Sequence, residues 1–300
     1  MPIQKLIVAA LLCASLTAAA QTPAAITTDP APDKANPAAM QSFQLPSHGA
    51  LLNAIVYVAA GPGPHPVVIL LHGFPGNEKN LDLAQSIRRA GWDVLCFNYR
   101  GSWGSPGAFS FTHAIEDTQS AIAYLRDPAN AAKLRSDPKY IVLVGHSMGG
   151  MIAANVAATD PDIRAVGLIS AANMAGHALP AVKGNQQEAV LPRIAQGLAA
   201  QGMAPLAGCT SESLARELLA NAAKWNLPDL ASKLSARPIL VVTSDDGLAD
   251  ASEELVANLR KIGDTEVKEA HIITDHAYSD RRIALQQTVL EGLDYLQSHR

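Results

Sequence analysis

Short apolar runs alternate with segments of helical periodicity along most of this chain, and several runs, such as VVILL at 67–71, contain no polar residue. A strand buried on one face alternates apolar and polar residues, whereas an uninterrupted run indicates burial on both faces. The pattern therefore predicts an α/β fold, with a mostly parallel central sheet and helices on both faces. The expected strands are 52–59, 67–71, 94–98, 140–144, 165–169, 239–243 and 267–273. The expected helices are 80–90, 113–126, 148–159, 248–262 and 281–298.

One segment interrupts this alternation. Residues 175–235 are rich in Ala, Leu, Gln and Gly and contain no strand-like run. Compact domains seldom include a structureless loop of this length. We therefore expect a helical cap at 175–235, inserted into a single α/β domain that extends over 42–300.

The N-terminus has the order of a secretory signal. Lys5 precedes an apolar run at 6–16, and Ala18–Ala20 then provide the small residues before a cleavage site. The run is too short to span a bilayer, which needs about 20 residues. We expect residues 1–20 to be a signal peptide that exports the protein, periplasmic or secreted, with no stable membrane insertion after removal. Residues 21–41, rich in Pro, Ala and Thr, are expected to form a flexible leader.

Composition and motifs exclude several classes of protein. The chain has 23 Lys and Arg against 27 Asp and Glu, and this balance does not suggest a nucleic-acid binder, which needs a clustered basic surface. It has no His-Glu-x-x-His, no Cys-x-x-Cys and no phosphate-binding loop ending in Lys-Ser or Lys-Thr. We therefore expect no metal, no cofactor and no nucleic-acid partner. Beyond the signal, Cys96 and Cys209 are expected to be separate buried thiols.

The sequence Gly145-His-Ser-Met-Gly149 predicts a catalytic serine. An apolar strand leads into this Gly-x-Ser-x-Gly motif and an Ala-rich helix leaves it. This order holds Ser147 in a tight turn with its hydroxyl above the sheet edge, where Gly145 and Gly149 avoid a collision across the turn. Ser147 is therefore the expected nucleophile.

A serine hydroxyl needs a base, and the base needs an orienting acid. His276 is the expected base because it follows the last expected strand, in the order Ser, acid, His. Two adjacent carboxylates, Asp245 and Asp246, end the preceding strand. Asp246 is favoured because Gly247 allows the turn toward the histidine, and Asp245 remains an alternative.

The developing oxyanion needs preset N–H donors. The strand at 67–71 leads into a Gly- and Pro-bent loop at 72–76. We expect the donors to be the backbone N–H groups of Phe74 and Met148, with His72 bracing the loop.

These motifs, in this order, resemble the α/β-hydrolase superfamily over residues 42–300. The sequences at 72–78 and 99–105, with Asp275-His276 before Ser279-Asp280, are similar to serine aminopeptidases and prolyl-oligopeptidase-like hydrolases. The resemblance implies that the loop at 99–105 lines the mouth of the site, which places Tyr99, Arg100 and Trp103 beside the substrate. The glycine usual at the end of the acid-bearing strand is Ser244 here.

The expected function is a serine hydrolase that cleaves a carboxylic ester in a small-molecule substrate through an acyl-enzyme. A peptidase with the same triad, acting on a short peptide, is one alternative. Charged residues of the cap would recognise that peptide, although a solvated helix face explains them equally well. An inactive hydrolase-like binding protein is the other alternative.

Overall fold

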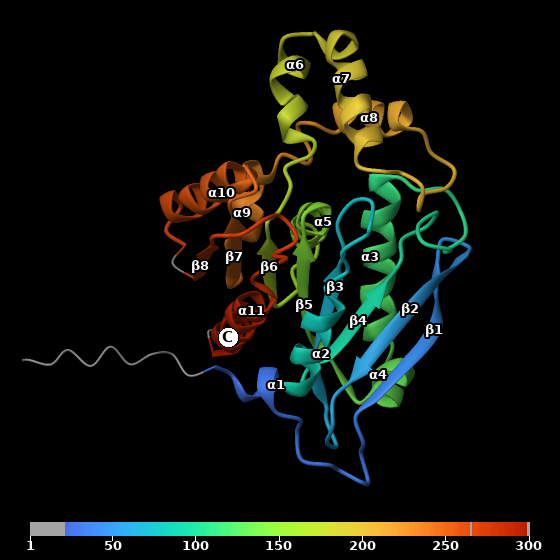
Figure 1. Ribbon diagram of the computed structural model, residues 1–300, viewed down its shortest axis with the longest axis vertical. Coiled ribbons are helices and arrows are strands. Elements are labelled where there is room, and N and C mark those ends of the chain that lie inside the picture. The colour runs from blue at the N-terminus through green and yellow to red at the C-terminus, as the bar shows by residue number, and fades with distance from the viewer. Residues whose placement is uncertain (1–21, 265, 299–300) are drawn as a thin grey trace, which may run out of the picture.

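The computed structural model describes residues 22–264 and 266–298, and within them eight strands form one sheet (Figure 1). In order across the sheet they are β1 (Ala39–Ser47), β2 (Ala50–Val58), β4 (Asp93–Phe97), β3 (His65–Leu71), β5 (Ser136–His146), β6 (Ala165–Ile169), β7 (Ile239–Ser244) and β8 (Val267–Ile272). β2 is antiparallel to both β1 and β4, and every pairing from β4 to β8 is parallel. The carboxyl ends of β3 to β8 therefore meet at one edge of the sheet.

Helices cover both faces of the sheet. One face carries α3 (Phe111–Arg126), α4 (Pro128–Leu134), α5 (Met148–Ala157) and α10 (Ala249–Lys261). The other carries α2 (Leu81–Arg89) and α11 (Arg282–Ser298), with the short α1 (Ala24–Thr27) beside them (Figure 1). Every residue of β4 and β6 is buried, as the uninterrupted apolar runs require. The predicted α/β fold class, with a mostly parallel sheet between two layers of helices, is confirmed.

Strand β1 and helix α4 were not among the expected elements. β1 is an edge strand in which exposed residues such as Gln44 alternate with more buried ones, so it contains no continuous apolar run. Helix α4 has only seven residues, too few to show a helical period.

Helices also fill the segment between β6 and β7. They are the 3-10 helix η1 (Gly176–Ala178), α6 (Leu179–Lys183), α7 (Gln187–Ala200), α8 (Ser211–Ala220), the 3-10 helix η2 (Leu227–Leu230) and α9 (Ala231–Leu234). Helices α6, α7 and α8 lie beyond the carboxyl ends of the central strands (Figure 1). The sequence-based boundaries of the cap, 175–235, stay a prediction.

Backbone hydrogen bonds tie this segment to the loop that follows β4. The N–H of Trp103 donates to the carbonyl of Pro205 at 2.9 Å, and the N–H of Ala207 donates to the carbonyl of Gly101 at 2.8 Å. The N–H of Phe109 donates in turn to the carbonyl of Ala207 at 2.9 Å. The cap is thus held to the core through main-chain atoms on this side of the molecule.

A side chain of the cap also caps a core helix. The carboxylate of Glu217, on α8, accepts hydrogen bonds from the N–H groups of Phe111 and Thr112 at 3.0 and 2.7 Å. These amides open α3, where N–H groups have no partner within the helix. A negative charge here is also favoured by the helix dipole.

The N-terminal predictions fall largely outside the described residues. The expected signal peptide, 1–20, is not among them, and export stays a prediction. The expected leader, 21–41, contains α1 and the first residues of β1, and its flexibility stays a prediction. Within the described ranges, no helix combines the length and apolar character needed to cross a membrane. Cys96 is a buried free thiol as expected. Cys209 is also free, but the expectation that it is buried is wrong, because it lies on the connection between α7 and α8, which packs only partly against the core.

Candidate active site

Ser147 occupies a strained turn between β5 and α5. Its φ is 57° and its ψ is −121°, a conformation that L-residues rarely adopt. A Cβ on Gly145 would lie 2.0 Å from the carbonyl oxygen of Gly149, and one on Gly149 would lie 2.1 Å from that of Leu71. Both positions therefore require glycine. The turn holds Ser147 at the carboxyl edge of the sheet, as the motif predicts.

The structure brings His276 and Asp246 together. His276 lies between β8 and α11, and its Nδ1 is 2.7 Å from Oδ2 of Asp246, whose side chain is 3% exposed. Burial acts to raise the pKa of the Asp246 carboxyl. Hydrogen bonds from His276, from the Leu248 N–H and from Ser170 outweigh burial and bring that pKa below its usual value. The carboxylate therefore stays ionised beside the imidazole.

Asp245, the alternative acid, points elsewhere. Its Oδ1 is 3.0 Å from Nε2 of His271, a residue of β8, and both side chains are about half exposed. The other ring nitrogen of His271 lies 2.9 Å from the hydroxyl of Thr243. The neighbouring carboxylates thus serve different histidines, and Asp246 is the one placed to orient His276.

Buried hydroxyl groups support the acid. Ser170 Oγ lies 2.9 Å from Ser244 Oγ and 2.9 Å from the hydroxyl of Tyr278. Burial raises the pKa of Tyr278 to about 12, so the phenol remains a neutral hydrogen-bonding group. Ser244, the residue that departs from the usual glycine, therefore supplies a hydroxyl to the network beside Asp246. No local sequence pattern indicates this role.

The loop after β3 lies against the serine. A Cβ on Gly73 would lie 2.9 Å from Cβ of Ser147 and 3.3 Å from its Oγ. Among the described residues, none accepts a hydrogen bond from the N–H of Phe74 or of Met148. The two predicted oxyanion donors therefore remain free to bind a ligand oxygen. The Ser147 hydroxyl likewise makes no hydrogen bond to any described residue, and catalytic hydrogen bonds often tighten only when substrate binds.

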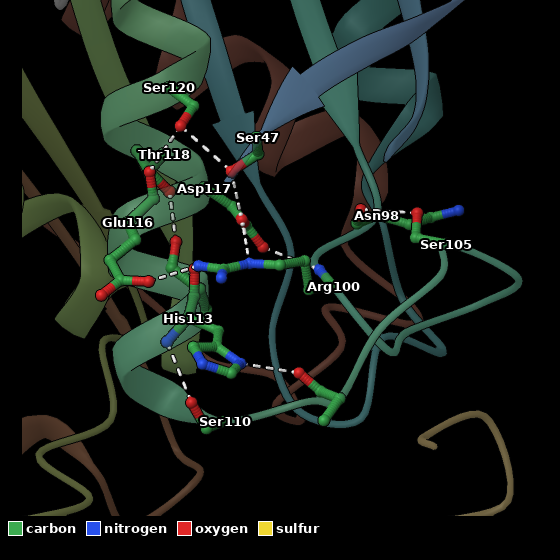
Figure 2. Close-up of polar contacts among 12 residues, drawn as sticks. Ser47, Asn98, Arg100, Ser105, Ser110, His113, Glu116, Asp117, Thr118 and Ser120 are labelled. Atoms are coloured by element: carbon green, nitrogen blue, oxygen red, sulfur yellow. Dashed lines mark hydrogen bonds and ion pairs between the residues drawn. The ribbon is translucent and has the colours of Figure 1, made fainter. Parts of the chain in front are cut away.

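Arg100 forms a buried ion-pair network instead of an open contact surface (Figure 2). Its Nε lies 2.7 Å from Oδ1 of Asp117, and its backbone N–H donates to the other oxygen of that carboxylate at 2.7 Å. Ser47 donates to Asp117 at 2.6 Å, and Glu116 pairs with the same guanidinium. Asp117 lies 17 residues beyond Arg100, on α3, so no local motif indicated this pairing. Substrate contact by Arg100 stays a prediction, and the observed contacts favour a structural role.

Tyr99 and Trp103 brace the loop at 72–76. The Tyr99 hydroxyl donates to the carbonyl of His72 at 3.1 Å, and Trp103 Nε1 donates to the carbonyl of Pro75 at 2.9 Å. Tyr99 is fully buried, whereas Trp103 is 39% exposed and has the Lys79 ammonium 4.3 Å from its ring centroid. Of the three predicted substrate contacts, only Trp103 presents much surface. Contact with substrate stays a prediction for Tyr99 and Trp103 as well.

His72 holds the same loop from within. Its Nδ1 lies 2.8 Å from the carbonyl oxygen of Gly73, and its ring packs against the Tyr99 ring with centroids 4.5 Å apart. Burial lowers the pKa of His72 to about 4. The imidazole is therefore neutral at neutral pH, and since a carbonyl only accepts, Nδ1 carries its proton. Bracing of the loop, the predicted role of His72, agrees with these contacts.

Potential metal ligands do not converge within residues 22–264 and 266–298. No group of three or more His, Cys, Asp or Glu side chains there has the proximity needed to hold an ion. Ser147, His276 and Asp246, each in or directly after a turn at the carboxyl edge of the sheet, are groups suited to nucleophilic and acid–base chemistry.

The family is shown by a match over more than half of the chain. Residues 66–264 match the family described as alpha/beta hydrolase fold, and the chain therefore belongs to this family. It is similar in structure to EstE1, a thermostable carboxylesterase from a metagenomic library, with a TM-score of 0.59, 20% identity, and coverage of 87% of this chain and 90% of that one. A hyperthermophilic esterase from Pyrobaculum calidifontis has a TM-score of 0.62 at 19% identity, over 88% of this chain and 86% of that one. These low identities establish a shared fold.

Curated relatives match only in part. The chain is 28% identical over 200 residues to a multifunctional-autoprocessing repeats-in-toxin protein of Vibrio vulnificus. The aligned residues make up 66% of this chain but only 3% of the toxin. It is 33% identical over 98 residues to the uncharacterized protein YfhR of Escherichia coli K12. This alignment covers 31% of this chain and 32% of that protein. The chain thus spans a small part of the toxin and about a third of YfhR.

Proposed function

We propose that this protein is a serine hydrolase that cleaves carboxylic esters through Ser147, His276 and Asp246. The observation that carries the proposal is the 2.7 Å contact between Asp246 and His276, at the sheet edge where Ser147 occupies its strained turn. The similarity in fold to solved carboxylesterases supports the ester as substrate.

The reaction would proceed by acyl transfer. His276 Nε2 accepts the hydroxyl proton as Ser147 Oγ bonds to the ester carbon, and the carbonyl electron pair moves onto oxygen. The N–H groups of Phe74 and Met148 hold this oxyanion, while Asp246 accepts the Nδ1–H and stabilises the imidazolium. Collapse breaks the bond to the alcohol oxygen, which takes the proton from His276. Water then repeats the sequence, releases the acid and restores Ser147. The Ser147–His276 hydrogen bond is expected to form as substrate binds.

Charges of the cap favour an ester over a peptide. A peptidase would need free charges to bind peptide termini, but Arg216 is paired with Glu188 and Glu212, each at 3.0 Å. Glu217 is occupied by the start of α3. These four charges of the cap are thus engaged within the protein, which supports a small uncharged substrate over a peptide that would need them.

A substrate panel tests the proposal. Short-chain aryl esters and aminoacyl and prolyl amides are compared on the purified protein and on Ser147→Ala. We expect ester turnover at least tenfold above amide turnover, and loss of both in the variant. Amide turnover equal to ester turnover would favour a peptidase, and unchanged ester turnover in Ser147→Ala would refute the mechanism.

The two adjacent acids provide a matched pair of variants. Asp246→Asn is expected to lower kcat by about 10⁴-fold, because the imidazole loses the acceptor that fixes its tautomer. Asp245→Asn removes an equal charge one residue away and is expected to leave kcat within about threefold, since Asp245 contacts His271. Equal losses in the two variants would contradict the assignment of Asp246.

An active-site fluorophosphonate separates the enzyme from an inactive binding protein. We expect the wild-type protein to be labelled and Ser147→Ala to remain unlabelled. Equally weak labelling of the two proteins would favour the inactive protein of the same fold.

We also propose that residues 1–20 direct export, on the charged, apolar and small-residue order of that segment. Expression of the full chain in a bacterial host, followed by mass spectrometry of the exported fraction, is expected to find a protein that begins at Gln21. Intact protein that begins at Met1 and is retained in the cytoplasm would refute export.

A further inference from the structure

His146, between Gly145 and the nucleophile, contacts the proposed base directly. It is the last residue of β5 and is 3% exposed. Its Nε2 lies 2.8 Å from the backbone carbonyl oxygen of His276, and the two imidazole rings are 4.8 Å apart at an interplanar angle of 34°. Because a carbonyl oxygen only accepts, Nε2 of His146 carries the proton and donates it to this bond.

The other hydrogen bonds of the loop that carries His276 join it to itself, to α11 and to the residues at the ends of β6 and β7. The Tyr278 N–H donates to the carbonyl of Asp275 within the loop, and Arg282 Nη1 donates to the carbonyl of Ala277 from α11. His146 is therefore the side chain that joins this loop to the strand end that bears Ser147. One residue thus contacts the backbone of the base while sharing a peptide bond with the nucleophile.

The His146 ring also suits a neighbour that gains charge. Burial, followed by the nearby His276, lowers the pKa of His146 to about 4, so its ring is neutral at neutral pH. Tyr278 packs against its edge with centroids 6.3 Å apart. When His276 accepts the serine proton, it therefore rests against an uncharged ring instead of a second cation.

We propose that His146 is a positioning residue for catalysis: its Nε2–H fixes the backbone of His276, and its ring fixes the plane of the His276 imidazole, so that Nε2 of His276 faces Ser147. This inference rests on the proposed function. Misplacement of a reacting group by about 1 Å costs up to about 10²-fold in rate. The loss should appear in kcat, because His146 is 3% exposed and offers almost no surface to a substrate.

Three variants separate the donor from the ring. His146→Phe keeps a ring without the donor, and we expect kcat for an aryl ester to fall by about tenfold to a hundredfold, with KM within about twofold. His146→Gln places an amide donor at similar reach, and we expect it to recover kcat to within about threefold to fivefold of wild type. His146→Leu removes both features and should fall at least as far as the Phe variant.

A second strand histidine provides the control. His65, at the opposite end of the sheet, also directs its Nε2 toward a backbone carbonyl, that of Gly61 at 3.2 Å. We expect His65→Phe to leave kcat within twofold while it lowers the unfolding temperature to a similar extent as His146→Phe. Loss of kcat in both variants, in proportion to lost stability, would show a merely structural role for His146.

Two further results would overturn the inference. One is a folded His146→Phe protein with kcat within twofold of wild type, and the other is equal impairment of the Phe and Gln variants. Ser147→Ala in the same assay keeps this test distinct from that of the proposed function. If Ser147→Ala is inactive and His146→Phe is fully active, the triad stands and only the role of His146 fails.

Discussion

Removal of the Asp117 carboxylate should destabilise the whole protein. In the wild type it accepts hydrogen bonds from the Arg100 side chain, the Arg100 N–H and Ser47, and it is completely buried (Figure 2). Asp117→Ala leaves the guanidinium of Arg100 mostly buried, with Glu116 as its remaining ionic partner. Breaking a buried pair by removal of one partner costs about 3–5 kcal/mol.

The size of the protein converts this energy into a temperature. Unfolding entropy is about 2.1 cal/mol/K per residue, hence about 0.6 kcal/mol/K for the roughly 280 residues that the structure describes. The Tm of Asp117→Ala should therefore fall by about 5–8 °C in scanning calorimetry. Glu116→Ala is the matched control: it removes a carboxylate from the same arginine, but one that is 33% exposed. Such a pair contributes up to about 1 kcal/mol, so Tm should fall by about 2 °C or less.

The comparison of the two variants decides whether burial of the carboxylate sets the size of the stability loss. Equal Tm changes in Asp117→Ala and Glu116→Ala would refute the reasoning, because the number of arginine partners, and not their burial, would then matter. We also expect Asp117→Ala to lower kcat. The loop after Arg100 carries Trp103, whose indole binds the carbonyl of Pro75 in the loop beside Ser147.

Three other predictions concern stability. The pKa values of His72 and His146 are lowered to about 4 by burial, against about 6.5 in an unfolded chain. Between these values the unfolded state binds more protons, so stability is unaffected above pH 6.5 and falls as pH drops toward 4, by up to about 3 kcal/mol for each histidine. Calorimetry from pH 7 to 4.5 should show this fall, with a smaller slope in His146→Gln, and an equal slope would contradict it. Glu217→Ala removes the acceptor of the first two N–H groups of α3 but leaves the N-cap bond from the His113 N–H to Ser110, so it should cost about 1 kcal/mol in urea unfolding. An unchanged urea midpoint would argue against that role. Ser244→Ala removes one hydroxyl beside the acid and should cost about 1 kcal/mol, with a severalfold loss of kcat. Full activity in Ser244→Ala would separate the hydroxyl network from catalysis.

The sheet was predictable because a strand buried on both faces has an uninterrupted apolar run of a few residues. VVILL at 67–71 and its counterparts needed no tertiary information to be recognised as buried strands. β1 has no such run, since only one of its faces packs on the core and its residues alternate in exposure. Its antiparallel pairing with β2, from Ala39 to Ser47, becomes apparent only in the structure.

The site was predictable only to the extent that its chemistry is local. The Gly-x-Ser-x-Gly turn is defined within five residues, and the order of acid and histidine follows from the strand ends. Gly247 favoured Asp246, but Asp245 stayed an alternative, because what separates the two acids is the position of two histidines on a later part of the chain. The contacts of Arg100, Ser244 and His146 were likewise missed, since each joins residues from different elements.

The ties between the cap and the core bear on how this fold can diversify. Trp103 and Phe109 donate through their main-chain N–H groups, and Pro205 and Ala207 accept through their carbonyls. Apart from proline, any amino acid supplies the same donor, and any amino acid supplies the same acceptor. Substitutions at the side chains of 205–207 can therefore accumulate without weakening these hydrogen bonds between cap and core, provided that the backbone keeps its path. Relatives could carry very different caps on an unchanged catalytic core, attached along the same line of main-chain bonds.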